Sequence, residues 1–580
     1  MEFRKTSWIS AALVTAAAIA GPALATAQNP NPGANVAEPY TPAKDAKDLK
    51  SVLFRWMWAT GMLKGHDERD MVATLEYQGK GTMQVDGQPC MLTKFRASTN
   101  YQTFAQRTQY TCTRANGQAY SNVEVVSGLY AWNEDTPGAE IAATKGKVTP
   151  MPAAVQERLI RLWASPQGAA KAAIMGTTET FWVGANPGTL FDGGLDKVGQ
   201  TSLTWQAGKP VVTFPIPAVA GATAVATLDT KFMAERVVVT LGSTTTEFTY
   251  SNYDDFNNPL NKIEVLSAGR MTERRSGAVV RDLTTTETET GNVYVVAPVP
   301  PSVQAAMKVT GQIPIGVFAK TEPQVNKSAP TPRVGAHPDL TGNWVYSDWI
   351  GNYMTGGGRR CGPTQRAGCN RSVNQTYDFE LYSPSRFGNL GRPVYKPQYW
   401  DKVQQLDMWT NKYDPVMTCL PLGVPREGPP RRILQTEKDV VFIYTGGDAG
   451  GGYGEFRIIP TDGRPHGRNA DFEITFLGDT VGRWEGDTLV LDAVGFSDQT
   501  WIGRGGFFHS DKMHVIEKFT RQGDALLYDV TVEDPEVLAA PWVFPTRVVR
   551  RNANPDAGLI RERGECEVFE TAAVATQIRH

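Results

Sequence analysis

The sequence predicts a mainly β protein, with an N-terminal curved antiparallel sheet around a helix and a C-terminal up-and-down β-barrel or sandwich. Three observations predict this class. Helical periodicity near the start gives way to long runs in which apolar residues alternate with a period of two. Turns that contain Gly separate these runs in both halves of the chain. A polar, proline-containing stretch divides the 580 residues, which are too many for one ordinary core.

The first 27 residues have the pattern of a secretory signal peptide. Arg4 and Lys5 precede a short apolar stretch at 8–20, and residues 25–27 fit a small-x-small cleavage site. The apolar stretch is too short to cross a bilayer, and no Cys stands at the cleavage point. We therefore expect a periplasmic or secreted protein with no integral membrane segment.

The charges of the chain are nearly balanced. There are 58 Lys and Arg residues against 60 Asp and Glu, which leaves a formal net charge of −2. A nucleic acid or an anionic membrane as partner requires a basic face. Neither partner is expected.

The first half of the chain predicts strands with two helical stretches. Apolar residues recur at steps of three and four from Leu49 to Met57, which is typical of a helix. Asp86-Gly87 then lies between two alternating runs, a strong hairpin signal. A second helical stretch around 155–163 is followed by more strands, to about residue 296. This order suggests a curved sheet wrapped around a helix.

The same order of elements resembles the lipoprotein-carrier fold of the periplasm, over roughly residues 40–300. The run at 247–256 (EFTYSNYDDF) is also similar to β-domains found ahead of some bacterial metallo-hydrolases. The resemblance implies a fold only. Since no HxHxDH metal motif follows, hydrolase chemistry is not implied.

The second half predicts about eight strands in meander order, joined by Gly-containing turns. Its opening Gly342-Asn343-Trp344 resembles the start of lipocalin-type barrels, in which the Trp plugs the barrel base. The segments 483–490 and 517–521 resemble a large set of exported bacterial proteins of unassigned function, which implies no chemistry. We favour a barrel over a sandwich for this half.

These patterns together predict the organisation of the chain. It consists of a signal peptide at 1–27, a leader at 28–42, a lipoprotein-carrier-like β domain with helices at 43–320, a linker at 321–338, and a lipocalin-like β domain at 339–580 with a long irregular segment at 350–432.

The irregular segment is rich in Gly, Arg, Pro and aromatic residues, and such long segments are usually functional or covering loops. Arginine forks recognise carboxylates, and aromatic rings stack on sugars or phenols. The alternative is that the arginines brace the loop by binding its carbonyl groups. The candidate ligand-binding residues are Arg359, Arg360, Tyr399, Trp400, Trp409 and Arg432.

Histidine is scarce, yet three of the six fall within fifty residues of the second domain, at 466, 509 and 514. His514, His509 and Asp498 are the candidates for acid–base catalysis, because a carboxylate can orient an imidazole that titrates near neutrality. His514 and Glu517 are three residues apart on a predicted strand and therefore point to opposite faces. No cofactor or metal is expected, and structural histidines remain the alternative.

Six cysteines in an oxidising compartment suggest disulfides. Cys90 and Cys112 lie on consecutive strand-like runs, and two others bracket a Gly/Arg loop. The absence of a CxxC pair argues against the competing zinc site. The predicted disulfides are Cys90–Cys112, Cys361–Cys369 and Cys419–Cys566.

Two functional hypotheses follow. The first is a carrier or receptor-like protein, in which the sheet-built modules bind a small apolar or aromatic molecule. The second is a periplasmic enzyme of the hydratase, isomerase or hydrolase type that uses a His/carboxylate pair in the second domain. Neither a GxSxG elbow nor a complete phosphate loop is present, which favours the first.

Overall fold

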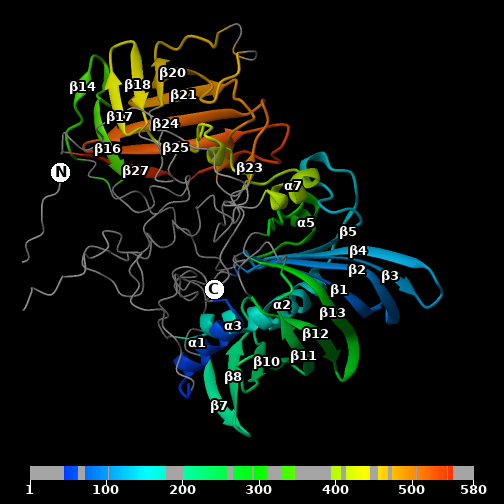
Figure 1. Ribbon diagram of the computed structural model, residues 1–580. Helices are drawn as coiled ribbons and strands as arrows, with labels where there is room; N and C mark the ends of the chain where they lie inside the picture. Colours follow the sequence, from blue (N-terminus) through cyan, green and yellow to red (C-terminus); the bar gives the residue numbers. More distant parts are fainter. Residues whose placement is uncertain are drawn as a thin grey trace, which may run out of the picture.

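The protein forms two large antiparallel sheets, seen in a computed structural model (Figure 1). The mainly β class predicted from the sequence is confirmed. The structure describes residues 45–62, 72, 74–101, 103–177, 200–257, 265–290, 293–310, 325, 328–346, 393–406, 413–444, 455–467, 470, 473–503, 506–544 and 546–552.

The first sheet has thirteen strands in the order β6-β5-β4-β3-β2-β1-β13-β12-β11-β10-β9-β8-β7, so two meanders join through β1 and β13. Its hairpin at Asp86-Gly87 is confirmed, with both residues at positive φ. The strands are β1 Thr74–Val85, β2 Gln88–Asn100, β3 Ala105–Arg114, β4 Ala119–Ser127, β5 Tyr130–Glu134, β6 Val148–Pro150, β7 Ser202–Gln206, β8 Lys209–Pro215, β9 Thr223–Leu228, β10 Ala234–Leu241, β11 Thr244–Asp254, β12 Ser267–Arg275 and β13 Ala278–Thr290.

The helix α2 shows that this sheet is curved. It contacts both β4 and β10, which lie seven strands apart in the sheet order. In a flat sheet that separation is about 33 Å, whereas a helix is only about 10 Å across. The two arms of the sheet therefore bend around α2, as Figure 1 shows. The α-helices and 3₁₀ helices (η) of this half are α1 Leu49–Ala59, η1 Ile141–Ala143, η2 Pro152–Ala154, α2 Val155–Ala164, α3 Pro166–Met175 and α5 Pro301–Ala306.

The helix α3 is not predicted by the sequence pattern. Half of its residues are Gly or Ala and all ten are buried, so no apolar stripe distinguishes an inner face from an outer one. The helices α1 and α2 agree with the two predicted stretches. Together α1, α2 and α3 supply much of the buried core against β8 to β11.

The second sheet is a nearly closed up-and-down barrel. Its nine-strand path is β19-β18-β17-β16-β27-β25-β24-β21-β20, and the edge strands β19 and β20 contact each other. The strands are β16 Gly342–Tyr346, β17 Arg432–Gln435, β18 Asp439–Ile443, β19 Phe456–Pro460, β20 Asp479–Glu485, β21 Thr488–Val494, β24 His514–Gln522, β25 Ala525–Glu533 and β27 Arg547–Arg551, with β26 Trp542–Val543 beside β25 and a separate hairpin of β22 Trp501–Gly503 and β23 Phe507–Phe508.

Trp344 lies inside this barrel, where it is 1% exposed. Its indole Nε1 donates to the Leu340 carbonyl oxygen at 2.9 Å, and the Arg521 guanidinium lies 5.6 Å from the ring centroid. Arg521 also donates to the Asp339 carbonyl oxygen. The Gly-x-Trp segment is thus held at the start of the first barrel strand.

The chain segment 393–406 connects the two sheets (Figure 1). It contains η4 Pro397–Tyr399 and α7 Trp400–Gln405. The Arg107 guanidinium, from β3, lies 4.2 Å from the Trp400 ring centroid. On the barrel side, the Lys402 Nζ lies 3.7 Å from the Phe508 ring centroid.

The C-terminal part of the predicted linker is packed against the barrel. Two short strands, β14 Arg333–Val334 and β15 His337–Pro338, form a hairpin there. The His337 ring stacks on Trp484 with centroids 4.5 Å apart, and Arg333 pairs with Asp487 at 3.0 Å.

The predicted disulfide Cys90–Cys112 is present between β2 and β3. Cys419 is also disulfide-bonded, and its partner lies outside the described residues. Cys361, Cys369 and Cys566 are outside them as well, so these two pairings stay predictions.

Candidate functional site

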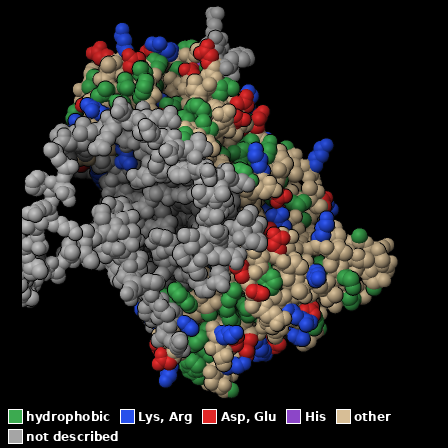
Figure 2. Space-filling model, in the orientation of Figure 1, with side chains coloured by type: hydrophobic (Ala, Val, Ile, Leu, Met, Phe, Trp, Pro, Cys, Tyr) green, Lys and Arg blue, Asp and Glu red, His purple; other side chains and the backbone are tan. Residues whose placement is uncertain are grey.

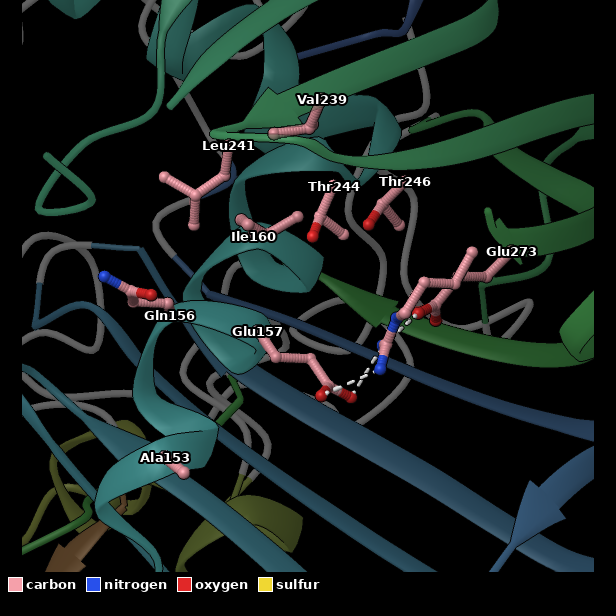
Figure 3. Close-up of a pocket in the computed structure, with 10 residues that line it drawn as sticks. Ala153, Gln156, Glu157, Ile160, Val239, Leu241, Thr244, Thr246 and Glu273 are labelled. Carbon is pink, nitrogen blue, oxygen red and sulfur yellow. Dashed lines mark hydrogen bonds and ion pairs between the residues drawn. The ribbon is translucent and has the colours of Figure 1, made fainter. Parts of the chain in front are cut away.

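An open pocket lies between helix α2 and strands β10 to β12 of the first sheet (Figure 3). Its volume is about 170 Å³. Figure 3 shows Ile160, Val239 and Leu241 at one side and the carboxylates of Glu157 and Glu273 at the other. The lining residues are Ala153, Gln156, Glu157, Ile160, Val239, Leu241, Thr244, Thr246, Glu273 and Arg275.

The polar end of the pocket is an ion-pair network. The Arg275 Nη2 lies 2.8 Å from Glu157 and 3.2 Å from Glu273, and Arg161 reaches both carboxylates from α2 at 2.7 and 2.9 Å. Burial by itself raises the pKa of Glu157, but Arg161 and Arg275 outweigh burial and lower the pKa to about 2. The charged groups of this wall are therefore matched with one another.

A second group, the His–carboxylate array, lies on the outer face of the barrel. Its members are His466, from the β19–β20 connection, and Asp479, Asp492, His514 and Glu533, on β20, β21, β24 and β25. His466 lies 2.8 Å from Asp479 through Nδ1 and 3.0 Å from Asp492 through Nε2. His514 lies 2.9 Å from the same Asp492 oxygen through Nε2 and 3.2 Å from Glu533 through Nδ1.

The array shifts the pKa values of His466 and Asp492. Burial lowers the pKa of His466, but the hydrogen bonds to Asp492 and Asp479 outweigh it, so the pKa is raised from 6.5. Burial raises the pKa of Asp492, and the two imidazoles outweigh that effect and lower it. These two shifts favour an ionised Asp492 beside a protonated His466 ring.

His509 lies elsewhere, in a buried site. It is 3% exposed, and its Nε2 lies 2.8 Å from the Thr500 hydroxyl while Nδ1 donates to the Ser510 carbonyl oxygen at 2.8 Å. Burial lowers the pKa of His509 and keeps its ring neutral. Asp498 is exposed on the neighbouring loop. The structure therefore brings His514 to a carboxylate, Asp492, but does not bring His509 or Asp498 into the array.

The predicted ligand-binding residues have varied positions. The Trp400 indole donates to the Tyr395 carbonyl oxygen at 2.9 Å and packs under Arg107, so it belongs to the junction between the sheets. The Tyr399 ring contacts Phe508, with centroids 5.7 Å apart. Arg432, on β17, is exposed. Arg359, Arg360 and Trp409 lie outside the described residues.

Sequence reasoning did not single out Asp479, Glu533 or the pocket residues on α2 and β12. A signal for Glu533 does exist, because Gln522 pairs with Ala525 around a two-residue turn. Counting back along both strands of that hairpin places His514 opposite Glu533. No such local count reaches His466, or the contact of α2 with β10.

Within the described ranges, no group of three or more His, Cys, Asp or Glu side chains is arranged to hold a metal ion. No helix in those ranges is long and apolar enough to cross a membrane. On the face drawn in Figure 2, basic and acidic side chains are interspersed over the described surface. A scan against protein-family models and a search of curated proteins both find no match for this chain.

Proposed function

We propose that this protein is a carrier or receptor-like protein of the periplasm or the extracellular space that binds a small apolar or aromatic molecule. The observation that carries the proposal is the pocket between α2 and β10 to β12, whose wall is apolar at one side. The disulfide Cys90–Cys112 supports an oxidising compartment.

The size of the pocket favours a ligand group about as large as one aromatic ring. Its volume is about 170 Å³, and an engineered apolar cavity of about 150 Å³ admits benzene. Ile160, Val239 and Leu241 supply apolar contacts for such a ring. A larger molecule can extend from the open side into solvent.

The charges of the pocket favour a neutral ligand. Arg275 already pairs with Glu157 and Glu273, so a charged ligand has to break an existing ion pair to gain one. The hydroxyl groups of Thr244 and Thr246 lie at the same pocket and can bind a hydroxyl or carbonyl group of the ligand.

Filling the pocket tests the proposal, with indole as a neutral aromatic probe. We expect Leu241→Trp to weaken indole binding at least about tenfold, because the new side chain occupies the apolar side of the pocket. The free energy gained by burying one aromatic ring corresponds to a change in affinity of that size or larger. The measurement is ligand-observed NMR with calorimetry, and native mass spectrometry of protein from its own host identifies a retained molecule.

Val238→Trp is the matched control for this test. Val238 is half-buried on the same strand, but it is next to Val239 and so points to the opposite face of the sheet. Equal indole affinity in the two variants, or no affinity in the unmodified protein, would contradict a ligand site here.

The second candidate function is the enzyme, which the pair of His514 and Asp492 at 2.9 Å favours. A His/carboxylate pair can act as acid and base. Both ring nitrogens of His514 face carboxylates, however, so a substrate has to displace one of them. A turnover that survives His514→Ala would exclude this role.

A further inference from the structure

The start of the connection between β19 and β20 lies over the outer face of the barrel. Residues 461–467 form its described first part, and we call them the strap. The His466 ring contacts Asp479 on β20 and Asp492 on β21, and the Gly463 amide donates to the Gly482 carbonyl oxygen of β20 at 3.0 Å. The other strap charges, Asp462 and Arg464, pair with each other at 2.7 Å.

The number of hydrogen-bond donors in the array depends on the protonation of the two imidazole rings. A neutral imidazole has one N–H donor and one acceptor nitrogen, whereas an ionised carboxylate only accepts. In each of the two rings, both nitrogens lie within 3.2 Å of a carboxylate oxygen, each from a different carboxylate. All four contacts are hydrogen bonds only when His466 and His514 are both protonated. Loss of one proton places a nitrogen lone pair against a carboxylate oxygen.

The charges around the array support protonation. Three carboxylates, of Asp479, Asp492 and Glu533, surround the two rings. Several other charged groups on these elements lie in pairs of their own or opposite another charge. The Arg483–Glu485 pair lies further along β20, the Lys512–Asp511 pair precedes β24, Lys518 on β24 stands opposite Asp529 on β25, and the strap has Arg464 with Asp462.

We propose that His466 and His514 form a pH-sensitive clasp, which holds the strap on the barrel while both rings are protonated and releases it when they lose a proton. The strap leads from β19 into β20, the two edge strands that meet at the seam of the barrel. Release of the strap therefore loosens the connection across that seam.

The direction of the pH effect follows from the raised pKa of His466. A ring whose pKa is higher in the folded protein than the ordinary 6.5 stabilises the fold fully below pH 6.5. This stabilisation is lost as the pH rises through the folded-state pKa. Asp492, with its lowered pKa, stays ionised throughout this range.

Hydrogen exchange of the full chain tests the clasp. After correction for the intrinsic rate, we expect the protection of amides in 461–467 to fall about tenfold or more between pH 6 and pH 9, which is the size of one lost hydrogen bond to a charged group. His466→Gln should show the low protection at both pH values. His337→Gln is the control, because the His337 ring stacks on Trp484 and takes no part in the array. The protection of 461–467 in this variant should change with pH as it does in the unmodified protein.

A ring titration by NMR keeps the test independent of whether the variants fold. His466 should titrate above 6.5 in the unmodified protein, and His514→Gln should raise the pKa of His466 further, because the variant removes a positive partner that shares the same Asp492 oxygen. A His466 ring that titrates at or below 6.5, or strap protection that does not change with pH, would overturn the proposal. Recovery of protection at pH 9 on adding zinc alone would also overturn it, in favour of a metal site.

Discussion

Glu517 and Arg457 form an ion pair inside the barrel, with Glu517 fully buried and Arg457 5% exposed. The Arg457 Nη1 lies 2.6 Å from Glu517, and its Nε donates to the Tyr444 hydroxyl at 2.9 Å. The Tyr528 hydroxyl donates to the other Glu517 oxygen at 2.8 Å. Because Arg457 is on the edge strand β19 and Glu517 is on β24, the pair links the seam to the interior of the barrel.

Removing the charge of Glu517 should therefore destabilise the barrel strongly. We expect Glu517→Gln to cost about 3–5 kcal/mol, since it leaves the Arg457 charge buried without its partner. Glu485→Gln is the control, because Glu485 pairs with Arg483 at half-exposed positions where such pairs contribute about 0–1 kcal/mol. Hydrogen exchange of β24 peptides measures the stability of the barrel separately from that of the other sheet. A Glu517→Gln barrel as stable as the control would refute this role.

At the scale of elements, the central strands β1 and β13 bend where the first sheet curves. Their register shifts between Gln78 and Gly79. Nearby, Gly81 has φ +144°, and a Cβ there would overlap the Asp282 carbonyl oxygen of β13. Close approach of the two backbones at this point requires a residue without a side chain.

A side chain at Gly81 should separate the two arms of the sheet. We expect Gly81→Ala to destabilise the first domain by at least about 2 kcal/mol, from backbone strain together with the overlap. Gly87→Ala, at the β1–β2 turn, should cost only about 1 kcal/mol, because φ is +73° but no described atom lies within 4 Å. Urea unfolding, followed by hydrogen exchange of β1 and β13 peptides, compares the stability of the two variants. Equal losses of stability in both variants would argue against a close approach of the backbones at Gly81.

At the scale of the whole molecule, the segment 393–406 holds the two sheets together. It pairs with β3 and β2 through Trp400 under Arg107 and through Asp401, which lies 3.2 Å from Arg96. The Tyr294 hydroxyl, shortly after β13, donates to the Pro393 carbonyl oxygen at 2.6 Å. The irregular segment thus contributes to the junction, a role that the sequence did not predict for Trp400.

Loss of the Trp400 ring should uncouple the sheets without unfolding either of them. We expect Trp400→Ala to increase the radius of gyration in small-angle X-ray scattering and to separate the thermal transitions of the two domains. Trp205→Ala removes an indole that is 44% exposed on β7 and should change neither property. Unchanged scattering in Trp400→Ala would show that other contacts determine the junction.

The sequence by itself determined the mainly β class, the first helix, the hairpin turns and the Cys90–Cys112 pair. All of these depend on residues near one another in the chain, through periodicity and turn chemistry. Only the tertiary structure brings together the residues of the pocket, of the Arg457–Glu517 pair and of the His–carboxylate array. Glu157 meets Arg275 because the sheet curves around α2, and His466 meets Asp492 because the start of its connection lies over paired strands. Contacts of this kind depend on strand order and curvature, which local patterns do not specify.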